Sequence, residues 1–185
     1  MRLRNHDTGY GLVTRSLHWA TLAVLVAQVG IGYLLDVDDS GRGRGRGRGG
    51  DSGRGRGRGG DEERSLLDRA FDGDDLLLSL HVALGLTLLL LAVVRLVWRR
   101  VAPLPPWAEC LSERERTWAH WTERVLYLAL LAAPLSGLLL VLVDDDFLAL
   151  HVASHVVLYG ALASHLALVL RHTAVRRNGL LRRML

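Results

Sequence analysis

The chain has 185 residues, which suits a single domain, and its one cysteine, Cys110, excludes an internal disulfide and any multi-cysteine metal or iron–sulfur site. Half of the residues are hydrophobic and 23% are charged, with a formal net charge of only +4. The two classes are segregated, because long apolar runs alternate with stretches rich in Arg and Asp. That layout is typical of a protein embedded in a lipid bilayer.

The N-terminal residues are charged and lack the small-residue cleavage pattern of a secretory signal, so we expect the first apolar run to be retained. Four segments are long enough to cross a hydrocarbon core, which takes about 20 residues. They cover approximately residues 17–35, 76–98, 121–143 and 147–170. Backbone polar groups in lipid must be satisfied internally, so each span is expected to be helical. The sequence predicts an all-α fold, a four-helix transmembrane bundle formed by one domain over residues 1–185.

Residues 36–75 interrupt this pattern with a low-complexity repeat of Gly and Arg, GRGRGRGRGGDSGRGRGRGGDEER. Glycine resists ordering and the segment cannot build a core, which predicts a flexible linker. Arg-Gly repeats also occur in RNA-binding tails. This one lacks interleaved aromatics and joins two membrane spans, so we expect no nucleic-acid partner.

The distribution of arginine predicts the orientation of the chain in the membrane. Twelve arginines flank the spans in the N-terminal segment, the loop between spans two and three, and the C-terminal tail. The opposite side has nine in the linker and none in the turn at Asp144–Asp146. Both basic flanks and the arginine-free turn agree, so we expect both termini in the cytoplasm.

Histidines point to a cofactor within the bundle. Six of the eight lie in or at the ends of the spans: His18, His81, His120, His151, His155 and His165. Ionisable residues in membranes are costly and usually face the bundle interior, so six in one small bundle favour ligation over packing. Zinc and copper sites gather ligands closely, often with thiolates or carboxylates, whereas these histidines are spread over both faces. Haem takes one histidine on each side of its iron.

Depth selects the pairs of histidines. His81 and His151 both lie near the start of spans that enter from the outer face. His165 follows His151 by 14 residues, which places it about 21 Å deeper and about 40° away around the helix. His18 opens the first span at the inner face. Spacing therefore pairs His81 with His151, and His18 with His165, as axial ligands of two haems.

Two other histidines compete for these roles. His120 opens the third span on the inner side and could replace His18, although an interfacial role suits it better. His155 lies one turn from His151 and about 80° from His165, which favours a hydrogen-bonding role. Near the span ends, Arg15, Arg95 and Arg99 could pair with haem propionates or simply set topology. The glycines within the spans could make room for haem or for helix packing.

The spans resemble those of the bacterial di-haem cytochrome b561 family. The resemblance rests on YGLVTRSLHWATLAVLV, LHVALGLTLLLLAVVRLVWR, AHWTERVLYLALLAAPLSG and HVASHVVLYGALASHLALVLRH, and covers nearly all of the chain except the Arg-Gly repeat. It implies two b haems held by His18, His81, His151 and His165, an inner-membrane location, and a quinone as electron partner. Small cytochromes of this type can also form homodimers.

The resemblance leaves the reaction open. Some relatives oxidise superoxide and carry a second histidine three residues after the one that opens the third helix, but Glu123 occupies that position here. The main expectation is electron transfer across or within the membrane to a quinone, with superoxide as one candidate electron donor, as an oxidoreductase acting on both would use it. One alternative is a haem-bearing anchor subunit of a dehydrogenase or hydrogenase, docked around Pro103–Glu115. Another is a haem-free, histidine-lined transporter of protons or metal ions. No nucleophile or acid–base catalytic set is expected.

Overall fold

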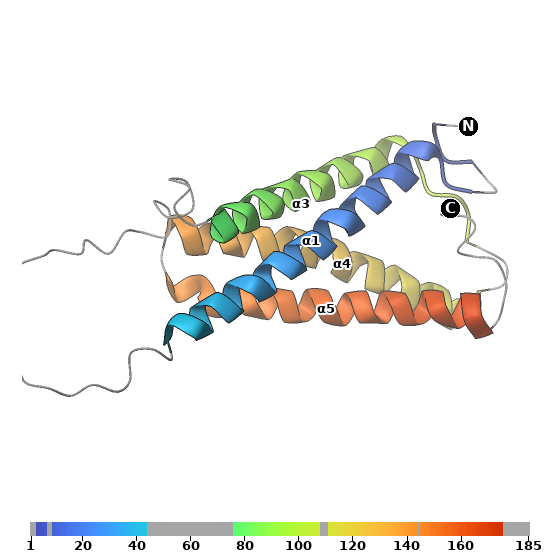
Figure 1. Ribbon diagram of the computed structural model, residues 1–185. Helices are drawn as coiled ribbons and strands as arrows, with labels where there is room; N and C mark the ends of the chain where they lie inside the picture. The colour runs from blue at the N-terminus through green and yellow to red at the C-terminus, as the bar shows by residue number, and fades with distance from the viewer. Residues whose placement is uncertain (1–2, 7–8, 44–75, 108–110, 144, 176–185) are drawn as a thin grey trace, which may run out of the picture.

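The computed structural model describes residues 3–6, 9–43, 76–107, 111–143 and 145–175, and these are almost entirely helical (Figure 1). The long helices are α1 (Leu12–Gly43), α3 (Leu76–Val101), α4 (Glu113–Leu142) and α5 (Leu148–Leu170). A short 3-10 turn, η2 (Asp145–Phe147), precedes α5, and a π-helical turn, η3 (Arg171–Val175), follows it. The predicted all-α, four-helix architecture is confirmed.

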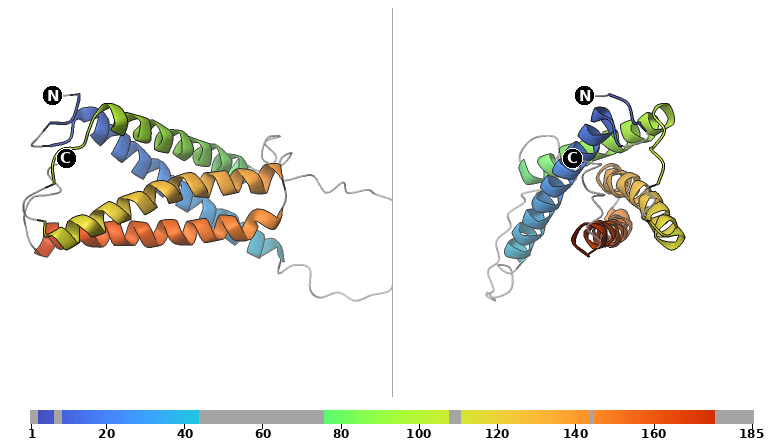
Figure 2. Two further views of the ribbon diagram at one scale, coloured as in Figure 1. Left: turned by 180° about the vertical axis from the view of Figure 1, so that it is seen from behind. Right: turned by 90° about the vertical axis from the view of Figure 1, so that its right-hand side faces the viewer.

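Successive helices run in opposite directions (Figure 1). The N-terminal segment, the α3–α4 connection and the end of α5 lie at one end of the bundle, and the η2 turn lies at the other. Close packing follows chain order, because α1 packs on α3, α3 on α4, and α4 most extensively on α5. Helix α1 crosses the bundle obliquely, so the four axes do not form a closed square (Figure 2).

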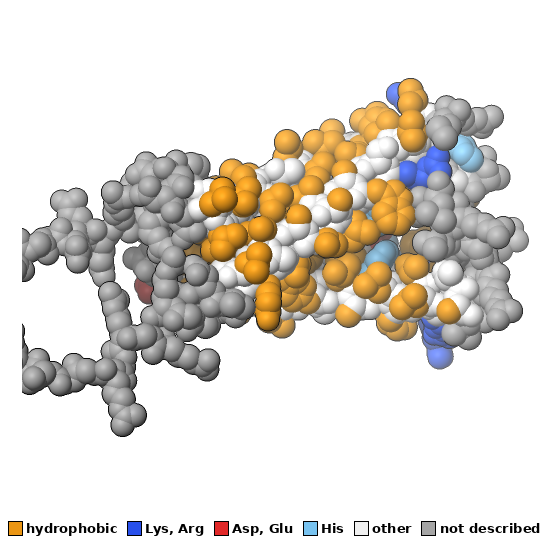
Figure 3. Space-filling model, in the orientation of Figure 1, with side chains coloured by type: hydrophobic (Ala, Val, Ile, Leu, Met, Phe, Trp, Pro, Cys, Tyr) orange, Lys and Arg blue, Asp and Glu red, His pale blue; other side chains and the backbone are white. Residues whose placement is uncertain are grey.

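The surface and the interior both suit a bilayer. Each long helix contains a stretch long and apolar enough to span a membrane: Leu12–Leu35, Leu76–Val101, Glu113–Leu142 and Leu148–Ala174. Apolar side chains cover the sides of the helices, and arginines gather towards the end that carries the N-terminal segment (Figure 3). In the interior, Ala92, Ala129 and Ala133 let the backbones of α3, α4 and α5 approach closely, as small residues do in membrane bundles.

Helices α1 and α4 extend furthest beyond their predicted spans, and α3 runs three residues further than predicted, to Val101. Helix α1 continues to Gly43, so residues 36–43 of the predicted linker are helical, because extending a formed helix costs far less than starting one. Residues 44–75 of that linker lie outside the described residues. Helix α4 begins eight residues before the predicted span at residue 121, because Ser112 and Glu115 form a reciprocal capping box at its start.

The N-terminal segment anchors the beginning of α1 against α3. The side-chain amide of Asn5 donates to the carbonyl oxygens of Ala102 and Pro103, both at 3.1 Å. Its Oδ1 accepts from the Gly11 backbone N–H at 3.0 Å and from the Thr14 hydroxyl at 2.7 Å. These contacts fix the start of α1, and therefore the depth of His18 one turn further on.

Candidate functional site

The structure brings His81 of α3 and His151 of α5 together near the η2 end of the bundle. Their ring centroids are 6.3 Å apart and the rings are nearly perpendicular, at 85°. Both side chains are partly buried. Two metal–nitrogen bonds of about 2 Å on either side of one metal atom separate imidazole centres by roughly 6 Å. His81 and His151, called the outer pair after their predicted side of the membrane, therefore have a spacing at which both could hold one metal atom between them.

Hydrogen bonds orient the His151 ring. Its Nδ1 lies 3.0 Å from the carbonyl oxygen of Ala133 and 3.2 Å from the Ser136 hydroxyl. A carbonyl only accepts, so Nδ1 carries the proton and Nε2 keeps its lone pair. Ligating histidines commonly donate their second nitrogen to such an oxygen. Gly137 provides the space for the ring, since a Cβ there would lie 2.8 Å from His151 Cε1.

Gln28 of α1 completes the surroundings of the outer pair. Its amide nitrogen lies 3.2 and 3.1 Å from the two ring nitrogens of His81. The side chain is buried, and its Oε1 has no hydrogen-bond partner among the described residues. Sequence reasoning missed Gln28, although a lone amide inside an apolar span is a visible signal. A buried oxygen without a hydrogen-bond partner indicates that a further polar group could bind at this point of the interior.

His18 of α1 and His165 of α5, called the inner pair, lie at the other end of the bundle, near each other and near Arg95 of α3. Neither histidine forms a hydrogen bond to any side chain or backbone group in the described part of the chain. Their ring nitrogens therefore keep their capacity to bind another group. Sequence spacing placed these residues at one depth, and the structure places them within electrostatic reach.

A charged cluster borders the inner pair. Arg99 forms a two-pronged ion pair with Glu123 of α4, and one of its two contacts measures 3.0 Å. Arg95 and Arg99 also lie over the ring of Tyr127, with 5.4 and 5.9 Å from guanidinium carbon to ring centroid. Glu123 thus satisfies Arg99, whereas Arg95 forms no ion pair with a described residue.

The competing histidines occupy other positions. His155 places its Nδ1 3.0 Å from the His151 backbone carbonyl one turn earlier, which is a local helix contact. Its ring lies 4.4 Å from that of His151, edge to face. His120 is partly buried and shows no polar contact to described residues. His155 therefore lies beside the outer pair, with its Nδ1 held by the backbone, whereas no polar contact joins His120 to either pair among the described residues.

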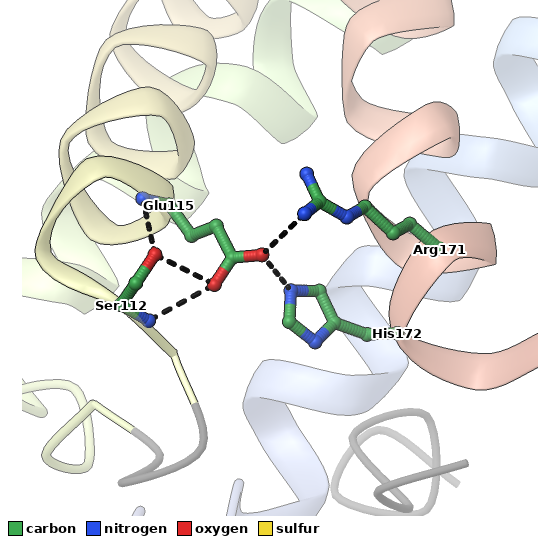
Figure 4. A network of polar contacts seen from close by, with 4 residues as sticks. All are labelled: Ser112, Glu115, Arg171 and His172. Atoms are coloured by element: carbon green, nitrogen blue, oxygen red, sulfur yellow. Dashed lines mark hydrogen bonds and ion pairs between the residues drawn. The ribbon is translucent and has the colours of Figure 1, made fainter. Parts of the chain in front are cut away.

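A separate polar network ties the start of α4 to the end of α5 (Figure 4). The buried carboxylate of Glu115 accepts two hydrogen bonds of 2.9 Å from Ser112 through one oxygen. Its other oxygen lies 3.4 Å from His172 Nε2 and 3.5 Å from an Arg171 nitrogen. His172 is 1% exposed, so this network holds the π-helical turn in place.

Comparison with known families identifies the chain. A family model described as prokaryotic cytochrome b561 matches residues 9–185. The chain belongs to the prokaryotic cytochrome b561 family. A search of curated proteins found no match. Family membership and four membrane-spanning helices make it a multi-pass bacterial membrane cytochrome that binds haem b and carries electrons.

The outer pair fits the haem that the cytochrome b561 family implies. Two facing imidazoles, one of them oriented by a backbone carbonyl, form the donor set that b-type haem uses. The unpartnered Gln28 oxygen lies beside them. The inner pair offers two histidines without competing hydrogen bonds and a nearby cation, a chemistry that also suits an anionic macrocycle.

Proposed function

We propose that this cytochrome holds two b haems, one between His81 and His151 and one between His18 and His165, and passes electrons across the membrane to a quinone. The observation that carries the proposal is the perpendicular His81–His151 pair at 6.3 Å. Spacing supports the second site, because His151 and His165 are 14 residues apart on α5. That separates the two sites by about 21 Å along the helix, most of a hydrocarbon core.

Bound haem b supplies reversible one-electron chemistry. The chain supplies the ligands and their surroundings. Ala133 and Ser136 orient the His151 ring, and Gly137 leaves room for it. The apolar core around Leu88, Leu130 and Leu158 excludes water between the two proposed haem sites. Redox-active groups are therefore expected only where the histidine ligands lie.

The orientation proposed for the chain places both termini in the cytoplasm. The N-terminal segment, the α3–α4 connection and the end of α5 share one end of the bundle (Figure 1). Arginines gather there, including Arg15, Arg100 and Arg114, and flanking arginine favours the cytoplasmic side. Reporter fusions after residue 107 and at the C-terminus should both report cytoplasm, and a fusion within residues 44–75 should report the opposite side. Reporter signals with the reverse pattern would contradict this orientation.

The deciding experiment is haem quantification on the purified protein combined with single substitutions. We expect two haems per chain, with sharp b-type bands in the reduced-minus-oxidised spectrum. His81→Ala and His151→Ala should each remove the outer haem, and His18→Ala and His165→Ala the inner one. A stoichiometry of one, or loss of the same haem from all four variants, would refute the two-site arrangement.

Quinone reduction is tested separately on the same preparation. Chemically reduced protein should be reoxidised by an added ubiquinone or menaquinone analogue at a rate that depends on quinone concentration. Retention of electrons in the presence of quinone, with reoxidation only by a co-purified redox subunit, would instead show an anchor subunit. The Arg99–Glu123 ion pair occupies the place where superoxide-oxidising relatives carry a histidine, so quinone is proposed without superoxide.

A further inference from the structure

We propose that Arg95 and Glu123 set the reduction potential of the haem held by His18 and His165, with Arg95 raising that potential and Glu123 lowering it. The inference deepens the proposed function and rests on it. Neither residue belongs to the four histidines assigned as ligands, so the ligand assignment itself requires neither of them.

The spacing of α3 places Arg95 at the inner site. Arg95 follows His81 by 14 residues, just as His165 follows His151 on α5. In both helices this spacing corresponds to about 21 Å along the axis and about 40° of rotation. Because α3 and α5 run in the same direction, Arg95 stands at the depth of His165, as His81 stands at the depth of His151.

Contacts within the structure agree with this placement. Arg95 interacts electrostatically with both His18 and His165, and Glu123 acts on His165 with the opposite sign. These groups come from four different helices, so the agreement does not follow from neighbouring positions in one helix. Arg95 and Glu123 therefore act on the same place from different sides.

The cluster does not neutralise itself. Two arginines, Arg95 and Arg99, lie over the Tyr127 ring, and Arg99 engages Glu123 through both carboxylate oxygens. Arg95 is partly buried and forms no ion pair with any described residue. An arginine at this depth without an acidic partner is costly, which favours a role for its charge.

Charge next to the site shifts the equilibrium between its oxidised and reduced forms. Reduction adds one electron, makes and breaks no bond, and lowers the local charge by one. A nearby cation therefore stabilises the reduced form and an anion the oxidised form, and low-dielectric surroundings strengthen both effects. Removing the Arg95 charge should lower the inner midpoint potential, and removing the Glu123 charge should raise it.

The test is a redox titration of the purified holoprotein followed by visible absorbance, with the inner component identified as the one retained in His81→Ala. Arg95→Gln should shift that component downwards and Glu123→Gln should shift it upwards, while the outer component stays in place. Arg95→Lys keeps the charge and should restore the wild-type value. Arg100→Gln and Glu113→Gln remove the same charges at exposed positions of α3 and α4 and serve as matched controls.

Each outcome decides the question. Opposite shifts confined to the inner component, with rescue by Arg95→Lys, would establish the inference. Shifts of one sign in both variants, equal shifts of both components, or shifts no larger than those of the controls would overturn it. If the wild type holds fewer than two haems, the proposed function is refuted, and so is this inference, which rests on it. If the wild type holds two haems but neither substitution changes their potentials, the inference is overturned while the proposed function stands.

Discussion

Substitution of Gly137 by alanine tests whether the His151 ring is held where the structure places it. A Cβ at Gly137 would lie 2.8 Å from Cε1 and 3.2 Å from Nδ1 of that ring. Relaxed contacts between carbon atoms are about 3.5–4.0 Å, so the ring would have to retreat by roughly 1 Å. Its Nδ1 is held by the Ala133 carbonyl at 3.0 Å, and the retreat would break that hydrogen bond.

The expected cost follows from these two effects. Overpacking of a close contact costs about 1–3 kcal/mol. Loss of the hydrogen bond costs about 0.5–1.5 kcal/mol. If the combined cost is about 2–4 kcal/mol and falls on the ligand, affinity for the outer haem drops roughly 30- to 1,000-fold. The variant should be purified with a deficit of one haem, or should lose one haem on dilution.

The assay is haem per chain together with the reduced-minus-oxidised spectrum, and glycines in two other helices serve as controls. Gly160→Ala meets nothing within 4 Å and should keep both haems. Gly32→Ala places a Cβ 3.4 Å from His81 Cε1, an ordinary contact, and should have only a small effect. Full haem content and an unchanged spectrum in Gly137→Ala would refute the reasoning, because the ring would then not be confined by α4.

Three further predictions concern the inner end of the bundle. The double variant of His18 and His165 to alanine should lose no more haem than either single variant, because both belong to one site; an additive loss measured as haem per chain would contradict that. Glu115→Ala should destabilise the fold by about 2–4 kcal/mol, since a buried interaction and a helix cap are lost together. Glu115→Gln keeps the helix cap, so thermal melts of the holoprotein should show a smaller loss of stability than Glu115→Ala. Equal losses of stability in the two variants would show that the cap does not contribute. Asn5→Ala removes four hydrogen bonds between α1 and the α3–α4 connection. It should lower stability by about 2–4 kcal/mol and release the inner haem before the outer one on heating; simultaneous release would argue against a local anchor.

The helices and the depth of each histidine could be predicted from sequence because both depend on local spacing. An uncharged apolar run in a membrane protein has only one backbone solution, so its existence and type follow from composition. The 14-residue interval between His151 and His165 converts directly into depth and rotation. The early start of α4 was missed although its signal was present, since Ser112 and Glu115 show the S-x-x-E spacing of a capping box.

Contacts that depend on how helices rotate against one another could not be predicted. Gln28 reaches His81 only because α1 lies across α3, and no pattern within α1 reveals that crossing. The surroundings of the glycines within the spans could not be predicted either. Gly137 lies under a histidine ring and Gly160 faces open space, yet both appear in sequence as small residues in a span. The pairing of Glu123 with Arg99, rather than Arg95, is likewise settled by side-chain geometry.

The two ends of the bundle use the same helices for different purposes. At the outer end α3 contributes the histidine and α1 contributes an uncharged amide, Gln28. At the inner end α1 contributes the histidine, His18, and α3 contributes a cation, Arg95. Helix α5 supplies a histidine at both depths, so the exchange between α1 and α3 is what makes the sites unequal. Charged groups of both signs, Arg95 and Glu123, act on the inner site, whereas the amide of Gln28 beside the outer site is neutral, so the proposed shifts of reduction potential are confined to the inner end.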